Sequence, residues 1–123
     1  MRSVSSLILS MVMYIMISTP TVASSDRLLD CIKISSHLYR ITHVEYDAGH
    51  RSISFDMVQT AKDLLDDFLD IAYQKYKIDN SSIVRAMRFN EPYYFRLEDR
   101  YGVQGTIRFL ANRAGDCAVH FGI

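Results

Sequence analysis

The segment from Tyr93 to Ile123 alternates between apolar and polar residues, and this pattern constrains the fold more than any other feature of the chain. The apolar positions are the odd-numbered ones: Tyr93, Phe95, Leu97, Ile107, Phe109, Ala111, Cys117, Val119, Phe121 and Ile123. Period-two alternation is typical of antiparallel strands that bury one face. Glycine-containing stretches at 99–105 and 113–115 supply turn residues between the alternating stretches. The pattern therefore predicts a three-stranded meander.

The middle of the chain has the pattern of a long amphipathic helix, from about Phe55 to Lys77. Ser54 precedes it as an N-cap residue, and Asp56 places a negative charge in the first turn, where the helix dipole favours it. Apolar residues recur at intervals of three and four: Val58, Ala61, Leu64, Leu65, Phe68, Leu69, Ala72 and Tyr76. A stripe this broad needs an apolar partner, and the apolar face of the predicted meander supplies one.

The remaining segments complete an α+β prediction. A first helix begins at Ser24 or Ser25, and residues 38–46 and 51–55 are predicted to pair as a hairpin. Ser82–Phe89 fits either a short helix or a strand. The predicted architecture is an antiparallel sheet packed on the long helix and the N-terminal helix. This order of elements resembles that of cystatin-like and nuclear-transport-factor-like folds, in which a long helix lies across a bent sheet.

The C-terminal segment also admits a second interpretation. Some of its apolar residues fit a helical spacing as well as a strand: Val103, Ile107, Leu110 and Ala111. Intervals of three and four residues place side chains on one helical face. The alternative to the α+β fold is therefore an all-α bundle.

The N-terminus has the parts of a secretory signal peptide: a charged start, an apolar run from Val4 to Ile17, and small residues beyond it. Cleavage after Ala23 or after Ser24 fits the small-residue rule. The apolar run is shorter than the roughly 20 residues that span a bilayer, which favours a cleaved peptide over a membrane anchor. The sequence therefore predicts a leader at 1–23 and a single small domain at 24–123, secreted or periplasmic.

The chain contains two cysteines, Cys31 and Cys117. An even number of cysteines behind a signal peptide indicates a disulfide. Closing a loop of this length stabilises a small domain by about 4 to 5 kcal/mol in the loop-entropy description. Neither cysteine stands in the CxxC or Cys/His spacing of a zinc site. The sequence therefore predicts a Cys31–Cys117 bridge between the first helix and the last strand.

The chain shows no motif for catalysis, metal binding or cofactor binding. None of the histidines has the spacing of a zinc site: His37, His43, His50 and His120. An aspartate-rich stretch, Asp66-Asp67-Phe68-Leu69-Asp70, falls on the polar face of the long predicted helix, where amphipathicity accounts for acidic residues. We therefore expect no catalytic residue, no metal ligand and no cofactor.

The distribution of charge and aromatic residues points to a protein partner. The formal net charge is +0, which excludes attraction of the whole molecule to nucleic acid or to an anionic membrane. The outward face of the predicted meander would carry five residues: Tyr94, Arg96, Arg108, Leu110 and His120. Tyrosine and arginine are enriched in the energetic centres of protein interfaces. We expect these five residues to bind another protein.

These features together predict an exported, non-enzymatic binding protein. An immunity or inhibitor protein that neutralises a cell-envelope toxin or hydrolase fits its size, export and disulfide. One alternative is a small secreted enzyme or ligand carrier with a pocket between the long helix and the sheet. Its predicted lining residues are Phe55, Phe68, Tyr76, Phe95, Phe109 and Phe121. A further alternative is an accessory subunit of an envelope secretion or pilus system.

Overall fold

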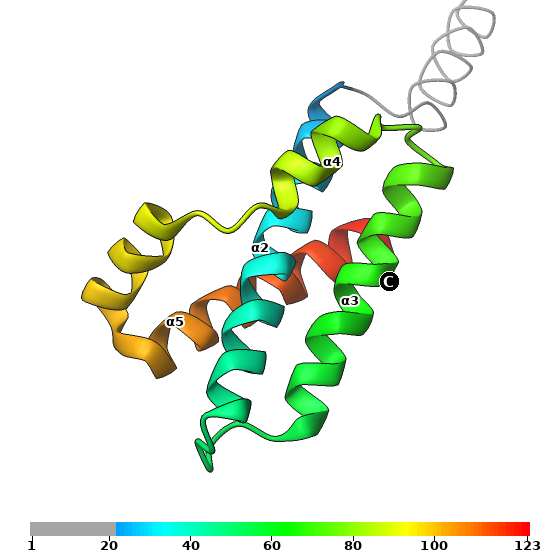
Figure 1. The fold of residues 1–123 in the computed structure, drawn as a ribbon. Coiled ribbons are helices and arrows are strands. Elements are labelled where there is room, and N and C mark those ends of the chain that lie inside the picture. Colours follow the sequence, from blue (N-terminus) through cyan, green and yellow to red (C-terminus); the bar gives the residue numbers. More distant parts are fainter. Residues whose placement is uncertain (1–21) are drawn as a thin grey trace, which may run out of the picture.

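The computed structural model describes residues 22–123, and all the regular secondary structure in this range is helical (Figure 1). Its elements are α2 (Val22–Asp47), α3 (Phe55–Gln74), α4 (Asn80–Met87) and α5 (Glu91–Phe121). The predicted α+β fold is therefore wrong, and the all-α alternative is the correct class. The predicted leader at 1–23 lies outside the described residues except at its last two positions, where α2 begins.

The predicted meander is wrong because only some residues of its apolar face are buried, and these belong to a helical repeat. The inward side chains of α5 follow one another at intervals of three and four: Ile107, Leu110, Ala114, Cys117 and Phe121. A period of 2 and a period of 3.6 both bring residues i and i+4 to the same side, so a short apolar run fits either. Leu110 lay on the outward, polar face of the predicted sheet. Its complete burial fits the helical repeat and not the alternation of a strand.

The predicted hairpin at 38–46 and 51–55 is also absent. Residues 38–47 continue α2, and only the loop 48–54 connects it to α3. The resemblance to cystatin-like and nuclear-transport-factor-like folds falls with the sheet. The apolar residues of α2 do not form one stripe, because this helix is buried on several sides. Its buried side chains are Leu28, Cys31, Ile32, Ile34, Ser35, His37, Leu38, Ile41 and Thr42.

Helix α2 is the central element, and the other helices pack around it (Figure 1). The core has two clusters. One surrounds the cysteines and contains Leu28, Cys31, Ile32, Leu65, Phe68, Ala72, Ile83 and Cys117. The other lies towards the α2–α3 loop and contains Ile34, Leu38, Ile41, Ile53, Val58, Ala61, Ile107, Leu110 and Ala114. Helix α2 contributes to both clusters and contacts all three of the other helices.

Helix α3 forms where the sequence predicted it. The Ser54 hydroxyl accepts the Met57 N–H at 3.2 Å, which confirms Ser54 as the N-cap, and Asp56 stands in the first turn. Its buried residues all belong to the predicted apolar stripe: Val58, Ala61, Leu65, Phe68 and Ala72. The stripe packs mainly on α2 rather than on a sheet.

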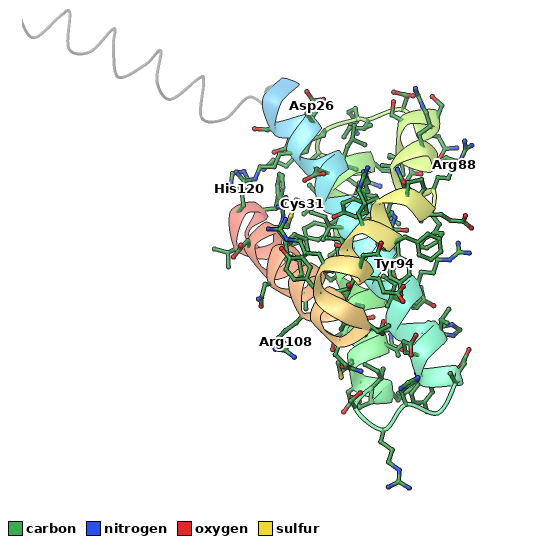
Figure 2. All side chains as sticks on the ribbon, turned by 90° about the vertical axis from the view of Figure 1, so that its left-hand side faces the viewer. Asp26, Cys31, Arg88, Tyr94, Arg108 and His120 are labelled. Atoms are coloured by element: carbon green, nitrogen blue, oxygen red, sulfur yellow. A yellow bond between two sulfur atoms is a disulfide. The ribbon has the colours of Figure 1, made fainter. Side chains whose placement is uncertain are left out.

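Helix α5 changes direction at Gly102, and its two halves run at an angle to each other (Figures 1 and 2). Gly102 has φ 71° and ψ 176°, a conformation that residues with a Cβ rarely adopt. The Thr106 hydroxyl donates to the Gly102 carbonyl at 2.7 Å and fixes the start of the second half. The glycine-containing stretch 99–105 thus marks a real break, but the break separates two helical halves instead of two strands.

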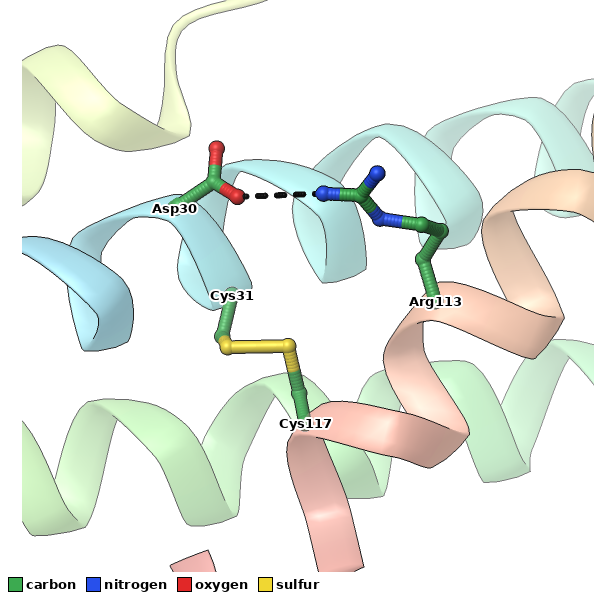
Figure 3. Close-up of a disulfide and its surroundings, with 4 residues drawn as sticks. All are labelled: Asp30, Cys31, Arg113 and Cys117. Carbon is green, nitrogen blue, oxygen red and sulfur yellow. Dashed lines mark hydrogen bonds and ion pairs between the residues drawn. A yellow bond between two sulfur atoms is a disulfide. The ribbon is translucent and has the colours of Figure 1, made fainter. Parts of the chain in front are cut away.

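The predicted disulfide is confirmed, and it joins two helices. Cys31 of α2 and Cys117 of α5 are bonded with a Cα–Cα distance of 5.9 Å (Figure 3). Beside it, the Arg113 guanidinium lies 3.5 Å from the Asp30 carboxylate (Figure 3). Both links connect the first described helix to the last one. The second half of α5 is therefore tied to α2.

Candidate functional site

The structure disperses the five residues that the sequence assigned to a docking face. Leu110 is 0 % exposed in the core, so it is unavailable to a partner. Tyr94 lies on the first half of α5, Arg108 just beyond the kink, and His120 at the other end of the second half (Figure 2). Within residues 22–123, no hydrogen bond, ion pair or ring contact joins any two of the five residues, Arg96 included.

The aromatic residues predicted to line a pocket are dispersed as well. Phe68 and Tyr76 each make an edge contact with Phe121 near the disulfide. Phe55 and Phe95 are exposed. A groove of about 390 Å³ does lie between α2, α3 and α5, but none of the predicted residues lines it. Its lining is apolar apart from a few polar groups and consists of Leu38, Thr42, Asp56, Met57, Thr60, Ala61, Leu64, Ile107, Ala111, Ala114 and Gly115.

The feature with the most specific local construction is the segment 88–90 between α4 and α5, here called the linker. Helix α4 ends at Met87 because Arg88 is extended, with φ −63° and ψ 132°. The Asn90 side chain then accepts the Tyr93 N–H at 3.0 Å and caps α5, with Pro92 in its first turn. The extended backbone of Arg88 therefore ends α4, and the Asn90 cap begins α5.

The last residue of α4 and the linker are each attached to α2 by a long-range hydrogen bond. The Ser36 hydroxyl donates to the Met87 carbonyl at 2.9 Å. The Asn90 N–H donates to His37 Nε2 at 3.1 Å. Since a backbone N–H can only donate, His37 Nε2 carries no proton, and Nδ1–H donates to the Lys33 carbonyl at 2.7 Å. Both ring nitrogens of His37 thus form hydrogen bonds with backbone groups.

Phe89 of the linker packs on α2, against His37 and Arg40. Its ring centroid lies 5.3 Å from that of His37 and 5.7 Å from that of Tyr94. The Arg40 guanidinium lies 4.4 Å from the Phe89 centroid, and the Lys33 ammonium lies 4.6 Å from the Tyr93 centroid. Cations stacked on aromatic faces keep their charge while their stems are held. The contacts therefore fix Lys33 and Arg40 beside the linker.

A groove of about 720 Å³ lies between α2, the end of α4 and the start of α5, and we call it the basic groove. Its lining residues are Lys33, Arg40, Arg85, Arg88, Phe89, Asn90, Glu91 and Pro92. Glu91 is the one carboxylate in this lining. Within residues 22–123, the ion pairs of the protein involve none of the four basic residues of the groove. The groove therefore presents cations that lack an intramolecular counter-ion.

A second groove of about 470 Å³ shares Arg40 and Phe89 with the basic groove. It is lined by Ser36, His37, Tyr39, Arg40, His43, Val44, Leu65, Met87 and Phe89. Burial lowers the pKa of His37 below its ordinary value of 6.5, and the positive charges of Lys33 and Arg40 act in the same direction. His37 is therefore neutral near pH 7.

This arrangement suits the binding of anions. Guanidinium groups bind carboxylates with two parallel N–H donors, and an aromatic floor restricts where the bound group can sit. His37 and Ser36 use their polar atoms for backbone hydrogen bonds. The chemistry that the basic groove offers is recognition of negative charge.

The sequence prediction missed this site, although the signals for its parts are present. Lys33 and Arg40 are seven residues apart, which puts them on one face of α2, and Arg85 and Arg88 are three apart. Beyond Asn80 the chain has arginines but no lysine. No local pattern showed that α4 packs beside α2, and this packing is what brings the two pairs together.

The rest of the described chain offers no stronger site. Residues 22–123 contain no group of three or more histidine, cysteine or acidic residues arranged to hold a metal ion. None of the helices in this range is long and apolar enough to cross a membrane. The chain matches no protein-family model, and comparisons with curated proteins and with solved structures found no similar protein.

Proposed function

We propose that the chain is an exported, non-enzymatic binding protein that holds an acidic segment of another protein in the basic groove. The observation that carries this proposal is the set of four basic side chains with no ion-pair partner in residues 22–123: Lys33, Arg40, Arg85 and Arg88. Complementary charge steers such a partner into the groove and fixes its orientation. Phe89 supplies apolar contact beneath the charges.

An acidic protein surface is favoured over nucleic acid as the occupant. The formal net charge of the whole chain is +0, so the molecule as a whole does not attract a polyanion. Binding to a phosphate backbone generally relies on a broad positive face. A rigid, disulfide-held module with one local docking site is what an immunity or inhibitor protein needs. A cell-envelope toxin or hydrolase with an acidic segment is therefore the proposed partner.

The proposed role accounts for the disulfide, which supports an oxidising compartment such as the periplasm or the extracellular space. An accessory subunit of a secretion or pilus system would use the same groove to hold its neighbour, and this role stays a prediction. Fusing the full chain to a reporter that is active only outside the cytoplasm tests export. A reporter that stays inactive contradicts it.

The groove itself is tested with a fluorescent peptide of glutamate residues and the oxidised protein. Fluorescence anisotropy is compared for the wild type and for the double variant Arg85→Glu, Arg88→Glu. Reversing both charges should weaken binding by at least about tenfold, because both cations face the same bound segment. The matched control reverses two exposed arginines of α5, Arg100→Glu with Arg108→Glu. Equal losses in the two double variants, or no loss in either, would contradict the proposal.

A further inference from the structure

The contact between His37 and Asn90 depends on the protonation state of the imidazole. The His37 side chain is 1 % exposed, and its two nitrogens bond to backbone groups on different elements. Nδ1–H donates to Lys33 O on the same helix, and Nε2 accepts the Asn90 N–H from the linker. The second bond exists only while Nε2 lacks a proton.

We propose that His37 is a pH-sensitive latch that holds the linker against α2 when neutral and releases it when protonated. A proton on Nε2 would place two N–H donors against each other at a heavy-atom separation that is now 3.1 Å. The hydrogen bond would be lost, and a charge would be buried beside Phe89 and Tyr93. The hydrogen bond from Ser36 to the Met87 carbonyl, at the end of α4 just before the linker, would remain.

The charges around His37 work against protonation in the closed state. On α2, Lys33 and Arg40 are both cations that lower its pKa. The cations Arg85 of α4 and Arg88 of the linker line the adjoining basic groove. Helices α3 and α5 contribute little negative charge near the ring. The neighbour from α3 is the apolar Leu65. The neighbours from α5 are Tyr93, whose pKa is raised by burial, and Glu91, which lines the basic groove. Protonation therefore adds to an existing excess of positive charge.

The direction of the pH effect follows from the lowered pKa. With the linker closed, His37 has a pKa below 6.5, whereas with the linker open and the ring hydrated it approaches 6.5. The open state therefore binds the proton more tightly. The closed state has its full stability above pH 6.5 and loses it as the pH falls through the lowered pKa.

Opening of the latch would divide the basic groove, and this consequence rests on the proposed function. One wall of the groove comes from α2, with Lys33 and Arg40. The other wall comes from α4, the linker and the start of α5, including Arg88 and Asn90. Release of Asn90 separates cations that bind the same segment. Acid would therefore weaken capture of an acidic partner.

The latch is tested first without any ligand, on the oxidised wild-type protein. NMR follows the imidazole of His37 and hydrogen exchange at the Asn90 amide between about pH 7.5 and about pH 5. We expect His37 to titrate with a pKa below its ordinary value of 6.5. The protection factor of the Asn90 amide, corrected for intrinsic exchange, should fall at least severalfold with protonation of His37. Protection of Asn90 that is independent of pH would overturn the proposal.

The variant His37→Gln supplies a second arm. A glutamine carbonyl can accept the Asn90 N–H without titrating, so protection of Asn90 should no longer change with pH in this variant. His43→Gln is the matched control, because His43 is exposed and pairs with Asp47 at 3.4 Å. It should behave as the wild type. A wild-type response in His37→Gln would overturn the latch.

Binding of the glutamate peptide separates the latch from the proposed function. The ratio of peptide affinities, wild type over His37→Gln, cancels titration of the peptide itself and should fall severalfold as the pH is lowered. If the peptide does not bind at any pH, the proposed function fails while the Asn90 exchange data still decide the latch. If the peptide binds and the ratio is constant, the coupling of the latch to the groove is contradicted.

Discussion

Cys31 of α2 and Cys117 of α5 are joined by a disulfide across 86 residues, with their Cα atoms 5.9 Å apart. The bond closes almost all of the described chain into one loop. Replacing both residues in the variant Cys31→Ala, Cys117→Ala should lower the free energy of unfolding by about 4 to 5 kcal/mol, since the unfolded chain regains its loop entropy. Urea denaturation measures this difference. Reduction of the wild type should have a similar effect, and an unchanged midpoint on reduction would contradict the account.

Leu110 distinguishes the helical core from the docking face that its sequence pattern predicted. It is 0 % exposed and lies in a cluster with Ile34, Leu38 and Ile107. Leu110→Ala should therefore lower the free energy of unfolding by about 2 to 5 kcal/mol through lost burial and the cavity left behind. Arg108→Ala, two residues away and exposed, should change it by no more than about 0.5 kcal/mol. Similar effects of the two substitutions in thermal denaturation would show that Leu110 is not in the core.

The kink in α5 depends on the backbone conformation of Gly102. Gly102 has a φ of 71°, so Gly102→Ala should destabilise the protein by about 1 to 3 kcal/mol through backbone strain. Gly115 lies within the second half of α5, and a Cβ there would have no atom within 4 Å. Gly115→Ala should therefore stabilise the protein by about 0.5 to 1 kcal/mol. Opposite signs in chemical denaturation support the kink, and stabilisation by both substitutions contradicts it.

Asp79 at the N-terminus of α4 should titrate well below a normal aspartate. The Ser81 hydroxyl is the main cause, and Ser82 donates to the carboxylate through its N–H at 3.1 Å and its hydroxyl at 2.9 Å. Together they lower the pKa of Asp79 from 3.8 to about 2. Because this pKa is depressed, the cap is fully formed above pH 3.8 and is lost as the pH falls through about 2. NMR titration of the carboxyl carbon checks the value, and Ser81→Ala should raise it. A midpoint near 3.8 in the wild type would contradict the cap.

Helix α3 was predictable because one of its faces is buried and the other is solvated. When only one face of a helix is buried, its apolar repeat predicts the helix directly. The repeat in α3 is Val58, Ala61, Leu65 and Phe68. Helix α2 is covered by three neighbours, so residues such as His37 and Thr42 are buried outside any single stripe. Each half of α5 contains only a short apolar run, and such a run fits both the period of a strand and that of a helix. In such cases the partner element decides the structure, and the partner is not encoded locally.

The docking site was unpredictable for the same reason. Its cations come from α2, α4 and the linker, and each pair has an unremarkable spacing in the sequence. Only the packing of α4 beside α2 places Arg85 and Arg88 opposite Lys33 and Arg40. The bond from Asn90 N–H to His37, across 53 residues, has no local signature either. The disulfide was predictable because it depends on residue type and compartment instead of on the fold.

The central claim is that the basic groove receives an acidic protein segment. The most direct measurement is an NMR titration of the isotope-labelled, oxidised protein with the glutamate peptide, following every backbone amide. We predict that the largest shift changes fall on the groove, at Lys33, Arg40, Arg88 and Asn90, and that they shrink as salt is added. Changes centred instead on residues 96–108, or no saturable change at all, would contradict it.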